Sequence, residues 1–308
     1  MEDNITPSVC VMMATYNGER YIEEQINSIL EQKQVRVRLI IRDDGSSDET
    51  LNILRRYEKS NGVTVITGEN LGPADNFYRL LHEAAPSDYY AWSDQDDIWD
   101  EDKLMQAIAL VKKEDEKKPI LYLSASRTIN ANKEPIGVIG TINPYCEFGR
   151  ALIHSKAQGA TFVFNNQLLE IAKMYTPEFG KFSILHDAWL HKVCLATGGI
   201  VVFDSQPHMS YRIHDRNVMA RISTEGLFMR LKASFSLKSQ NCYSNIANEL
   251  LLAYRDMMPS ENVKLAYTFA NYRRNFIYKL KVLFSSKIRT NNIKENLRFK
   301  ILVMLNKA

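Results

Sequence analysis

The chain has 308 residues, of which 45% are apolar and 24% are charged. This composition is typical of one large globular domain, or of one domain with an appendage, and it excludes global disorder. The net charge of +3 is unevenly distributed, because the segment from Lys264 to the end holds eleven basic residues and one acid. Residues 1–263 therefore carry a net charge of −7.

The cysteines and the apolar runs indicate the compartment. Cys10, Cys146, Cys194 and Cys242 lie far apart and form no CxxC pair, which is typical of reduced thiols in a cytosolic protein. No apolar run approaches the roughly 20 residues that span a bilayer. We therefore expect a cytoplasmic protein.

The first ninety residues alternate between strand and helix patterns. Residues 8–14 form a continuous apolar run, which predicts a strand buried on both faces. Isoleucines then recur at helical spacing from Ile22 to Ile29. Further strands are predicted at residues 37–42, 63–67 and 88–93, with helices between them. This alternation predicts a Rossmann-like, mostly parallel α/β sheet flanked by helices.

Polar residues gather directly after three of these strands. In open α/β sheets the ligand crevice lies at the carboxyl ends of the strands. The three clusters are therefore expected to meet in one cleft. They are Thr15, Tyr16 and Asn17; Asp43 and Asp44; and Asp94 and Asp96.

The second half of the chain is less regular. Strands are predicted at residues 120–125, 160–165 and 200–203, and helices at 166–175 and 187–196. After about Arg216 the pattern becomes helical and basic. We therefore expect one domain at residues 1–217 and a basic helical C-terminal region at residues 218–308.

An acidic cluster follows the fourth predicted strand. Asp100 to Asp102 suit the exposed start of the next helix, since acids favour a first helical turn. Asp94, Asp96 and Asp97 lie nearer the strand, where crowded carboxylates repel unless a cation offsets them. A calcium EF-hand loop is excluded, because Trp99 occupies the position of its glycine. Mg²⁺ or Mn²⁺ bridging a diphosphate fits better.

Four stretches, in order, resemble the inverting nucleotide-sugar glycosyltransferases of family two, which have the A-type fold. They are "MATYNGERYIEEQINSILEQ", "IIRDDGSSDET", "SDQDDIW" with its Asp-x-Asp element, and "LHDAWL" followed by "YRIHDRN". The form "SDQDDIW", with "HDAWL" and "YRIHDRN", looks most like the rhamnosyltransferase-type subgroup of bacterial surface-polysaccharide synthesis, such as O-antigen or capsule. The resemblance implies transfer from a nucleoside-diphosphate sugar, dTDP-rhamnose or a UDP-hexose, to a polyprenyl-diphosphate-linked glycan.

The resemblance also implies roles for residues at the donor site. Asp43 or Asp44 would accept a hydrogen bond from the pyrimidine N3–H, while the other closes the turn; we favour Asp43 for the base. Asp94 would contact the ribose or the sugar, and Arg212 could pair with phosphate oxygens. The loop residues of the implied nucleotide pocket are Thr15, Tyr16, Asn17, Glu19 and Asn76, with Tyr16 stacking on the base.

The metal and the catalytic base are implied in the same way. Asp96 and His214 would hold Mg²⁺ or Mn²⁺, which would stabilise the departing diphosphate. Asp187 would be the general base that removes the proton of the acceptor hydroxyl. The residues alone favour a helix N-cap for Asp187. His186 and Trp189 would shape the acceptor pocket. Gly159 and Ala160 resemble the segment that faces the donor sugar.

The basic C-terminal region mixes cations with apolar residues from Phe276 to Phe284 at near-helical spacing. One interpretation is a peripheral anchor on the anionic inner face of the cytoplasmic membrane. The other is a basic helix packed on the catalytic domain. A nucleic-acid surface is not expected, since aromatic stacking platforms are not evident.

Two other functions stay open at this point. A nucleotidyltransferase also combines a Rossmann-like sheet with acidic metal ligands, but "TYNGE" lacks the usual glycine-rich phosphate loop. A non-catalytic sugar-nucleotide-binding partner would have a broken metal or base motif, whereas Asp94, Asp96, Asp187 and His214 are all present.

Overall fold

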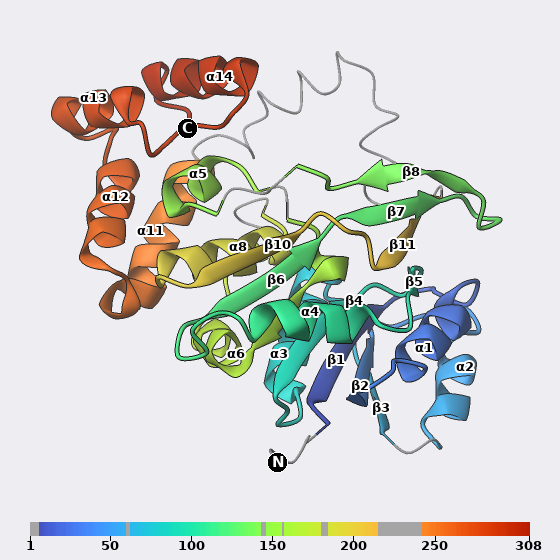
Figure 1. Ribbon diagram of the computed structural model, residues 1–308. Coiled ribbons are helices and arrows are strands. Elements are labelled where there is room, and N and C mark those ends of the chain that lie inside the picture. Colours follow the sequence, from blue (N-terminus) through green and yellow to red (C-terminus); the bar gives the residue numbers. More distant parts are fainter. Residues whose placement is uncertain (1–5, 60–61, 143–145, 156, 180–183, 215–241) are drawn as a thin grey trace.

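A computed structural model describes residues 6–59, 62–142, 146–155, 157–179, 184–214 and 242–308. A seven-stranded sheet forms its centre, in the order β10-β6-β9-β4-β1-β2-β3 (Figure 1). Only β9 runs antiparallel to its neighbours in this sheet, which confirms the mostly parallel α/β prediction. The strands are β1 (Ser8–Thr15), β2 (Arg36–Asp43), β3 (Val63–Thr67), β4 (Tyr89–Ser93), β6 (Ile120–Ser124), β9 (Val163–Asn165) and β10 (Ile200–Asp204).

Helices cover both faces of this sheet (Figure 1). In β1, Val9 and Val11 join the apolar cluster of α1, α2 and α4, while Cys10 and Met12 join that of α3, α6 and α8. This alternation explains why the strand is apolar at every position. The helices are α1 (Ile22–Leu30), α2 (Thr50–Tyr57), α3 (Pro73–Glu83), α4 (Lys103–Val111), α5 (Phe148–Ile153), α6 (Asn166–Lys173) and α8 (His186–Ala196).

A second, four-stranded sheet was not predicted. It contains β5 (Ile98–Trp99), β11 (Met209–Arg212), β7 (Ser126–Ile129) and β8 (Pro135–Ile139), in that order. Its strands are only two to five residues long, so their periodicity is too brief to read from the sequence. Pairing of β11 with β5 brings the segment that ends at His214 beside the acidic cluster.

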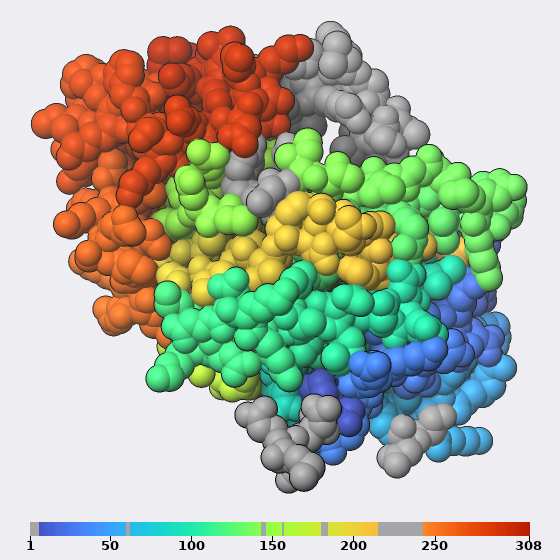
Figure 2. Space-filling view, in the orientation of Figure 1, coloured from blue at the N-terminus to red at the C-terminus, as the bar shows by residue number. Residues whose placement is uncertain are grey.

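The described C-terminal helices have no separate core among residues 242–308. Their buried residues, such as Leu250, Phe269 and Val303, join the same cluster as α3, α6 and α8. The proposed boundary at residue 217 lies outside the described residues, as does Arg216. Figure 2 shows the orange and red residues of these helices gathered at one side of the molecule. They are α11 (Cys242–Tyr254), α12 (Ser260–Ala270), α13 (Phe276–Phe284) and α14 (Ile293–Met304). Short 3₁₀ turns are η1 (Gly159–Thr161) and η3 (Arg255–Met257).

Candidate functional site

A cavity of about 1240 Å³ lies at the carboxyl edge of the central sheet. Its wall combines residues that follow β1, β2, β3 and β4 with residues from η1, α8 and the far side of the fold. The three predicted clusters therefore reach one site, as expected from the sheet topology. Predicted site residues in the wall are Thr15, Tyr16, Asp44, Asn76, Asp94, Asp96 and Asp187, together with Gly159, Ala160 and His186.

The β1–α1 loop gives the cavity its most exposed aromatic residue. The side chain of Tyr16 is 48% exposed, so its ring is free to contact a ligand. The side chain of Gln95, between Asp94 and Asp96, holds this loop through hydrogen bonds to Thr15 and Tyr16. Gln95 was not predicted, because nothing in the local sequence pattern connects it to a loop 80 residues earlier.

Asn17 and Glu19 connect loops and do not line the cavity. Asn17 has a positive φ of 49°, and its Oδ1 accepts the N–H of Ser47 at 2.8 Å. Glu19 accepts the N–H of Glu49 at 3.0 Å. These contacts fix the β1–α1 loop against the β2–α2 loop. A direct role of either residue in nucleotide binding stays a prediction.

Asp43 and Asp44 have different surroundings. Asp43 accepts the N–H groups of Gly45 and Ser46 at 3.1 and 2.9 Å and the Ser46 hydroxyl at 2.5 Å, which closes the turn. It does not line the cavity, whereas Asp44 does. Which of the two carboxylates contacts a base stays a prediction.

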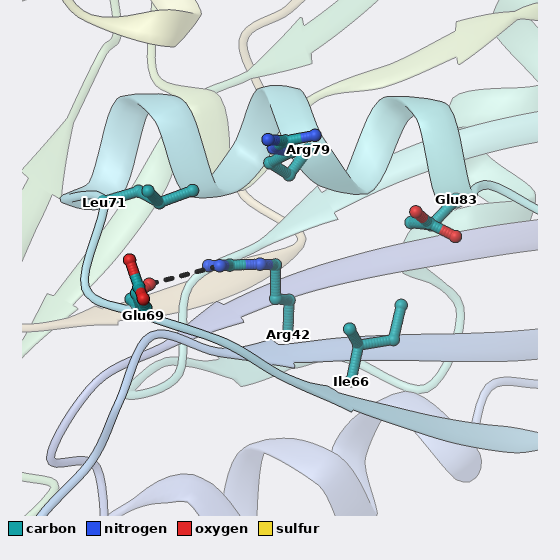
Figure 3. A pocket seen from close by; sticks show the side chains of 6 residues that line it. All are labelled: Arg42, Ile66, Glu69, Leu71, Arg79 and Glu83. Carbon is teal, nitrogen blue, oxygen red and sulfur yellow. Dashed lines mark hydrogen bonds between the residues drawn. The ribbon is translucent and has the colours of Figure 1, made fainter.

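Asp44 is held by a buried cation and two backbone donors. Arg42 donates to its Oδ1 at 2.6 Å and also to Asn76 Oδ1 at 2.9 Å. The N–H groups of Leu71 and Gly72 complete the set at 2.9 and 2.8 Å. Figure 3 shows Arg42 in a smaller cavity of about 300 Å³, bonded to the Glu69 carbonyl. The β3–α3 loop is therefore tied to Asp44.

Three carboxylates, those of Asp94, Asp96 and Asp187, lie in the wall of the large cavity. Burial, together with the neighbouring carboxylates of Asp96 and Asp187, raises the pKa of Asp94 to about 7. Their mutual repulsion makes the site suited to a cation. Carboxylate oxygens with one imidazole nitrogen are donors that Mn²⁺ and Mg²⁺ accept. The residues therefore fit the predicted metal.

His214 completes this group from the end of β11. Its Nε2 lies 2.8 Å from Asp96 Oδ2, and its ring contacts Tyr21 with a centroid distance of 5.1 Å. Asp97 faces the other way: burial raises its pKa, and it accepts the N–H of Arg212 at 3.1 Å. Asp97 is therefore a buried supporting residue of this segment.

Arg212 lies behind the acidic segment, and it does not line the cavity. Its side chain is 1% exposed. Its Nε donates to the Asp96 carbonyl at 2.9 Å and its Nη2 to Glu24 Oε2 at 2.5 Å. Arg212 thus anchors the backbone of Asp96 in this structure. Its predicted pairing with phosphate stays a prediction.

Asp187 lies in the first turn of α8, whose N-cap is Leu185. The N-cap alternative for Asp187 is therefore not what the structure adopts. Its Oδ2 accepts the N–H of Gly159 at 3.3 Å, and a Cβ on Gly159 would lie 3.1 Å from the Asp187 Cβ. A side chain on Gly159 would therefore require Asp187 or His186 to shift by a few tenths of an ångström. The carboxylate reaches the cavity wall beside Asp94.

The aromatic residues next to Asp187 separate into two groups. His186 stacks on Phe77 at a centroid distance of 4.1 Å, and burial lowers its pKa, so the ring is neutral at pH 7. It lines the cavity. Trp189 is fully buried between Tyr175 and Tyr254 and is absent from the wall. Trp189 supports α8 from the core instead of shaping the acceptor pocket.

A second acidic group lies at the start of α4. Asp100, Asp102 and His208 have ligand atoms within 4.8 Å of one another and could hold a metal ion. Two of the three already have charged partners, since Asp100 pairs with Arg127 and His208 with Asp204 at 3.0 Å. Asp102 is the N-cap of α4, without a side-chain capping bond. This group lies outside the cavity wall.

Comparisons with known proteins give this site a context. Residues 10–119 match the sequence model of glycosyl transferase family 2. The chain is 34% identical over 250 residues to dTDP-rhamnosyl transferase RfbG of Shigella flexneri, covering 71% of this chain and 78% of that protein. It is 40% identical over 103 residues to the putative teichuronic acid biosynthesis glycosyltransferase TuaG of Bacillus subtilis, covering 33% and 40%.

Solved structures share the fold at low sequence identity. TarS of S. aureus, solved with UDP-GlcNAc, superposes with a TM-score of 0.58 at 17% identity and covers 94% of this chain and 79% of that one. The mannosyltransferase PcManGT of Pyrobaculum calidifontis, in complex with GDP-Man and Mn²⁺, gives 0.52 at 17%, with 97% and 88% covered. The fold is the A-type glycosyltransferase fold, as predicted. The match to the family model and the identity to RfbG over most of both chains show that this protein belongs to glycosyltransferase family 2.

Proposed function

We propose that this glycosyltransferase moves a sugar, with inversion, from a nucleoside-diphosphate donor to a lipid-linked glycan in bacterial surface-polysaccharide synthesis. The observation that carries the proposal is the convergence of Asp94, Asp96 and Asp187 in one cavity. The identity to RfbG, a dTDP-rhamnosyl transferase, supports dTDP-rhamnose as the donor. A UDP-hexose is the alternative, in keeping with the UDP-GlcNAc bound to TarS.

The donor would lie along the side of the cavity that β1 to β4 form. Tyr16 is exposed there and would stack on the base, next to Asp44 and Asn76. Asp96 and His214 would hold Mg²⁺ or Mn²⁺, with Asp94 beside them. The ion would neutralise charge on the leaving diphosphate.

Asp187 would act on the acceptor from the opposite side of the site. Its carboxylate would take the proton of the attacking hydroxyl. The Gly159 N–H holds one carboxylate oxygen in place, and the absence of a side chain on Gly159 leaves room for Asp187 and His186. The neutral His186 would lie beside the acceptor without competing for its proton.

The acceptor and the membrane belong to the same proposal. The far wall of the cavity is mostly apolar, with Ile139, Leu152, Ile153, Ile184 and Ile246. We propose that this side receives the acceptor, which carries a polyprenyl diphosphate. No helix in the described ranges has the length and apolarity needed to cross a bilayer. Attachment to the cytoplasmic face of the membrane would therefore be peripheral.

Exposed apolar residues on α13 and α14 support that attachment. Phe276, Phe284 and Ile293 are 73%, 79% and 84% exposed, far above the exposure expected of packed side chains. Lys281 and Lys294 are exposed on the same two helices. Apolar side chains among cations are typical of surfaces that bind anionic lipids.

A donor panel tests the proposal. Purified protein is incubated with UDP-, dTDP- and GDP-sugars, a polyprenyl-diphosphate glycan and Mg²⁺ or Mn²⁺, and the release of nucleoside diphosphate is measured. We expect release with one donor, loss of release with EDTA, and a loss of roughly 10²–10⁴-fold in Asp187→Asn. Release that survives EDTA would contradict the metal role. Release that survives the substitution would contradict the role of Asp187 as base.

A further inference from the structure

The side-chain amide of Gln95 forms hydrogen bonds with both the N–H and the carbonyl group of Tyr16. Its Oε1 accepts the Tyr16 N–H at 2.9 Å, and its Nε2 donates to the Tyr16 carbonyl at 3.1 Å. The same Oε1 accepts the Thr15 hydroxyl at 2.5 Å. A side chain between two acidic residues of the proposed donor site thus fixes the loop that presents the exposed Tyr16 ring.

Gly18 makes room for this amide. A Cβ on Gly18 would lie 2.3 Å from Gln95 Oε1 and 2.8 Å from its Cδ, closer than real contacts allow. Gly18 does not have a positive φ, so its backbone accepts an alanine. The absence of a side chain at Gly18 is therefore explained by the Gln95 amide, with the Thr15 hydroxyl next at 3.0 Å.

We infer that Gln95 is a positioning residue that links the Asp94–Asp96 segment to the nucleotide loop and so sets the affinity for the base and ribose of the donor. The inference rests on the proposed function, in which Tyr16 contacts the base. The physical reason is preorganisation. Two hydrogen bonds to the Tyr16 backbone and one to the Thr15 hydroxyl keep Tyr16 in one position before the ligand arrives, so binding costs less conformational entropy.

An effect of Gln95 on the proposed metal site must be distinguished from its effect on the Tyr16 loop. Gln95 also lines the cavity, and its neighbours Asp94 and Asp96 are in the proposed metal site. A substitution could therefore act through the metal. Binding of UMP and dTMP in EDTA removes that route, because neither the metal nor the diphosphate bridge is then present.

The first experiment compares Gln95→Ala, Gln95→Glu and the wild type by calorimetric titration with UMP and dTMP in EDTA. We expect Gln95→Ala to raise Kd about tenfold, the change expected from one or two lost hydrogen bonds. Gln95→Glu keeps the acceptor oxygen but loses the donor to the Tyr16 carbonyl, so its Kd is expected to lie between the two. Gln106→Ala, on the exposed side of α4, is the matched control and should leave Kd unchanged.

The second experiment uses Gly18→Ala in both backgrounds. In the wild type its Cβ displaces the Gln95 amide, so Kd should rise about as much as in Gln95→Ala. In Gln95→Ala the amide is absent, and adding Gly18→Ala should change Kd less than twofold. Melting temperatures of all variants identify any that fail to fold, and the donor KM is expected to rise while kcat stays within about twofold.

The outcomes separate the inference from the proposed function. A wild type that binds neither nucleotide overturns both. A wild type that binds, with an unchanged Kd in folded Gln95→Ala, overturns the inference alone. Additive effects of Gly18→Ala and Gln95→Ala also overturn it, since they would show that Gly18 does not act through Gln95. Two results together support the inference. Gln95→Ala has a higher Kd than the wild type in EDTA, and Gly18→Ala has little further effect when it is added to Gln95→Ala.

Discussion

The imidazole Nε2 of His214 lies 2.8 Å from the carboxylate Oδ2 of Asp96, across 118 residues of sequence. Pairing of β11 with β5 holds the two segments together. Arg212 adds a second link, because its Nε donates to the Asp96 carbonyl. The proposed metal site is thus assembled by a small sheet that lies outside the central one.

Removal of the His214 imidazole should weaken metal binding. We expect His214→Ala to lower the affinity for Mn²⁺ by at least roughly 10–100-fold, the range found when even an outer partner of a metal ligand is removed. Calorimetric titration of Mn²⁺ measures this. His208→Ala is the matched control, since His208 belongs to the group with Asp100 and Asp102. Loss of binding in His208→Ala alone would put the metal at that second group.

A nucleotide whose base lacks the N3 proton can show which carboxylate, that of Asp43 or that of Asp44, contacts the base. Only Asp44 lines the cavity, so we expect Asp44→Asn to weaken the preference for UMP over N3-methyl-UMP, because a neutral amide oxygen is a weaker acceptor than a carboxylate. Asp43→Asn should keep that preference and lower the free energy of unfolding by about 1–2 kcal/mol, because the backbone donors of Gly45 and Ser46 lose a charged acceptor. Loss of the preference in Asp43→Asn would assign the base contact to Asp43.

Lys103 should give the unfolding free energy a distinct pH dependence. Its buried Nζ has no hydrogen-bond partner in the described structure, and burial lowers its pKa to about 7. The unfolded chain keeps this proton up to its usual pKa near 10.4. Between pH 7 and that value the unfolded state binds more protons, so stability rises with pH.

Replacement of Lys103 by Met removes this contribution. Between pH 7 and 8.5 the wild-type free energy of unfolding should rise relative to that of Lys103→Met by up to about 1.4 kcal/mol per pH unit. Urea unfolding at three pH values measures the two slopes. Lys112→Met, a substitution at the exposed end of α4, should follow the wild type. Equal slopes in the wild type and Lys103→Met would show that the Lys103 pKa is not lowered.

Vesicle binding should depend on the exposed face of α13. Phe276→Ser and Phe284→Ser each remove an apolar ring that is more than 70% exposed. We expect at least a tenfold loss of partitioning to anionic vesicles for each, given about 1.5–3 kcal/mol for burial of a phenylalanine. Ile136→Ser, on the exposed β8, is the control. Binding that neither phenylalanine affects, or that neutral vesicles support equally, would contradict the membrane role of this helix.

The central sheet and its cluster of functional residues were largely predictable from the sequence. Apolar runs such as residues 8–14 report burial on both faces, because strand periodicity is local. The polar residues after β1, β2 and β4 then converge, because parallel strands end at one edge. The cavity wall contains four residues that were predicted in this way: Thr15, Asp44, Asp94 and Asp96.

Only the tertiary structure decided which neighbouring residues face the cavity and which support it. Asp44 lines it while Asp43 closes a turn, and Arg212 lies behind Asp96. The sequence pattern likewise did not predict the hydrogen bonds between Gln95 and Tyr16 or the short strands of the second sheet. The sequence by itself determined the elements and their shared edge, since these follow from local periodicity. The tertiary structure determined the contacts across 80 or more residues, because they depend on how those elements pack.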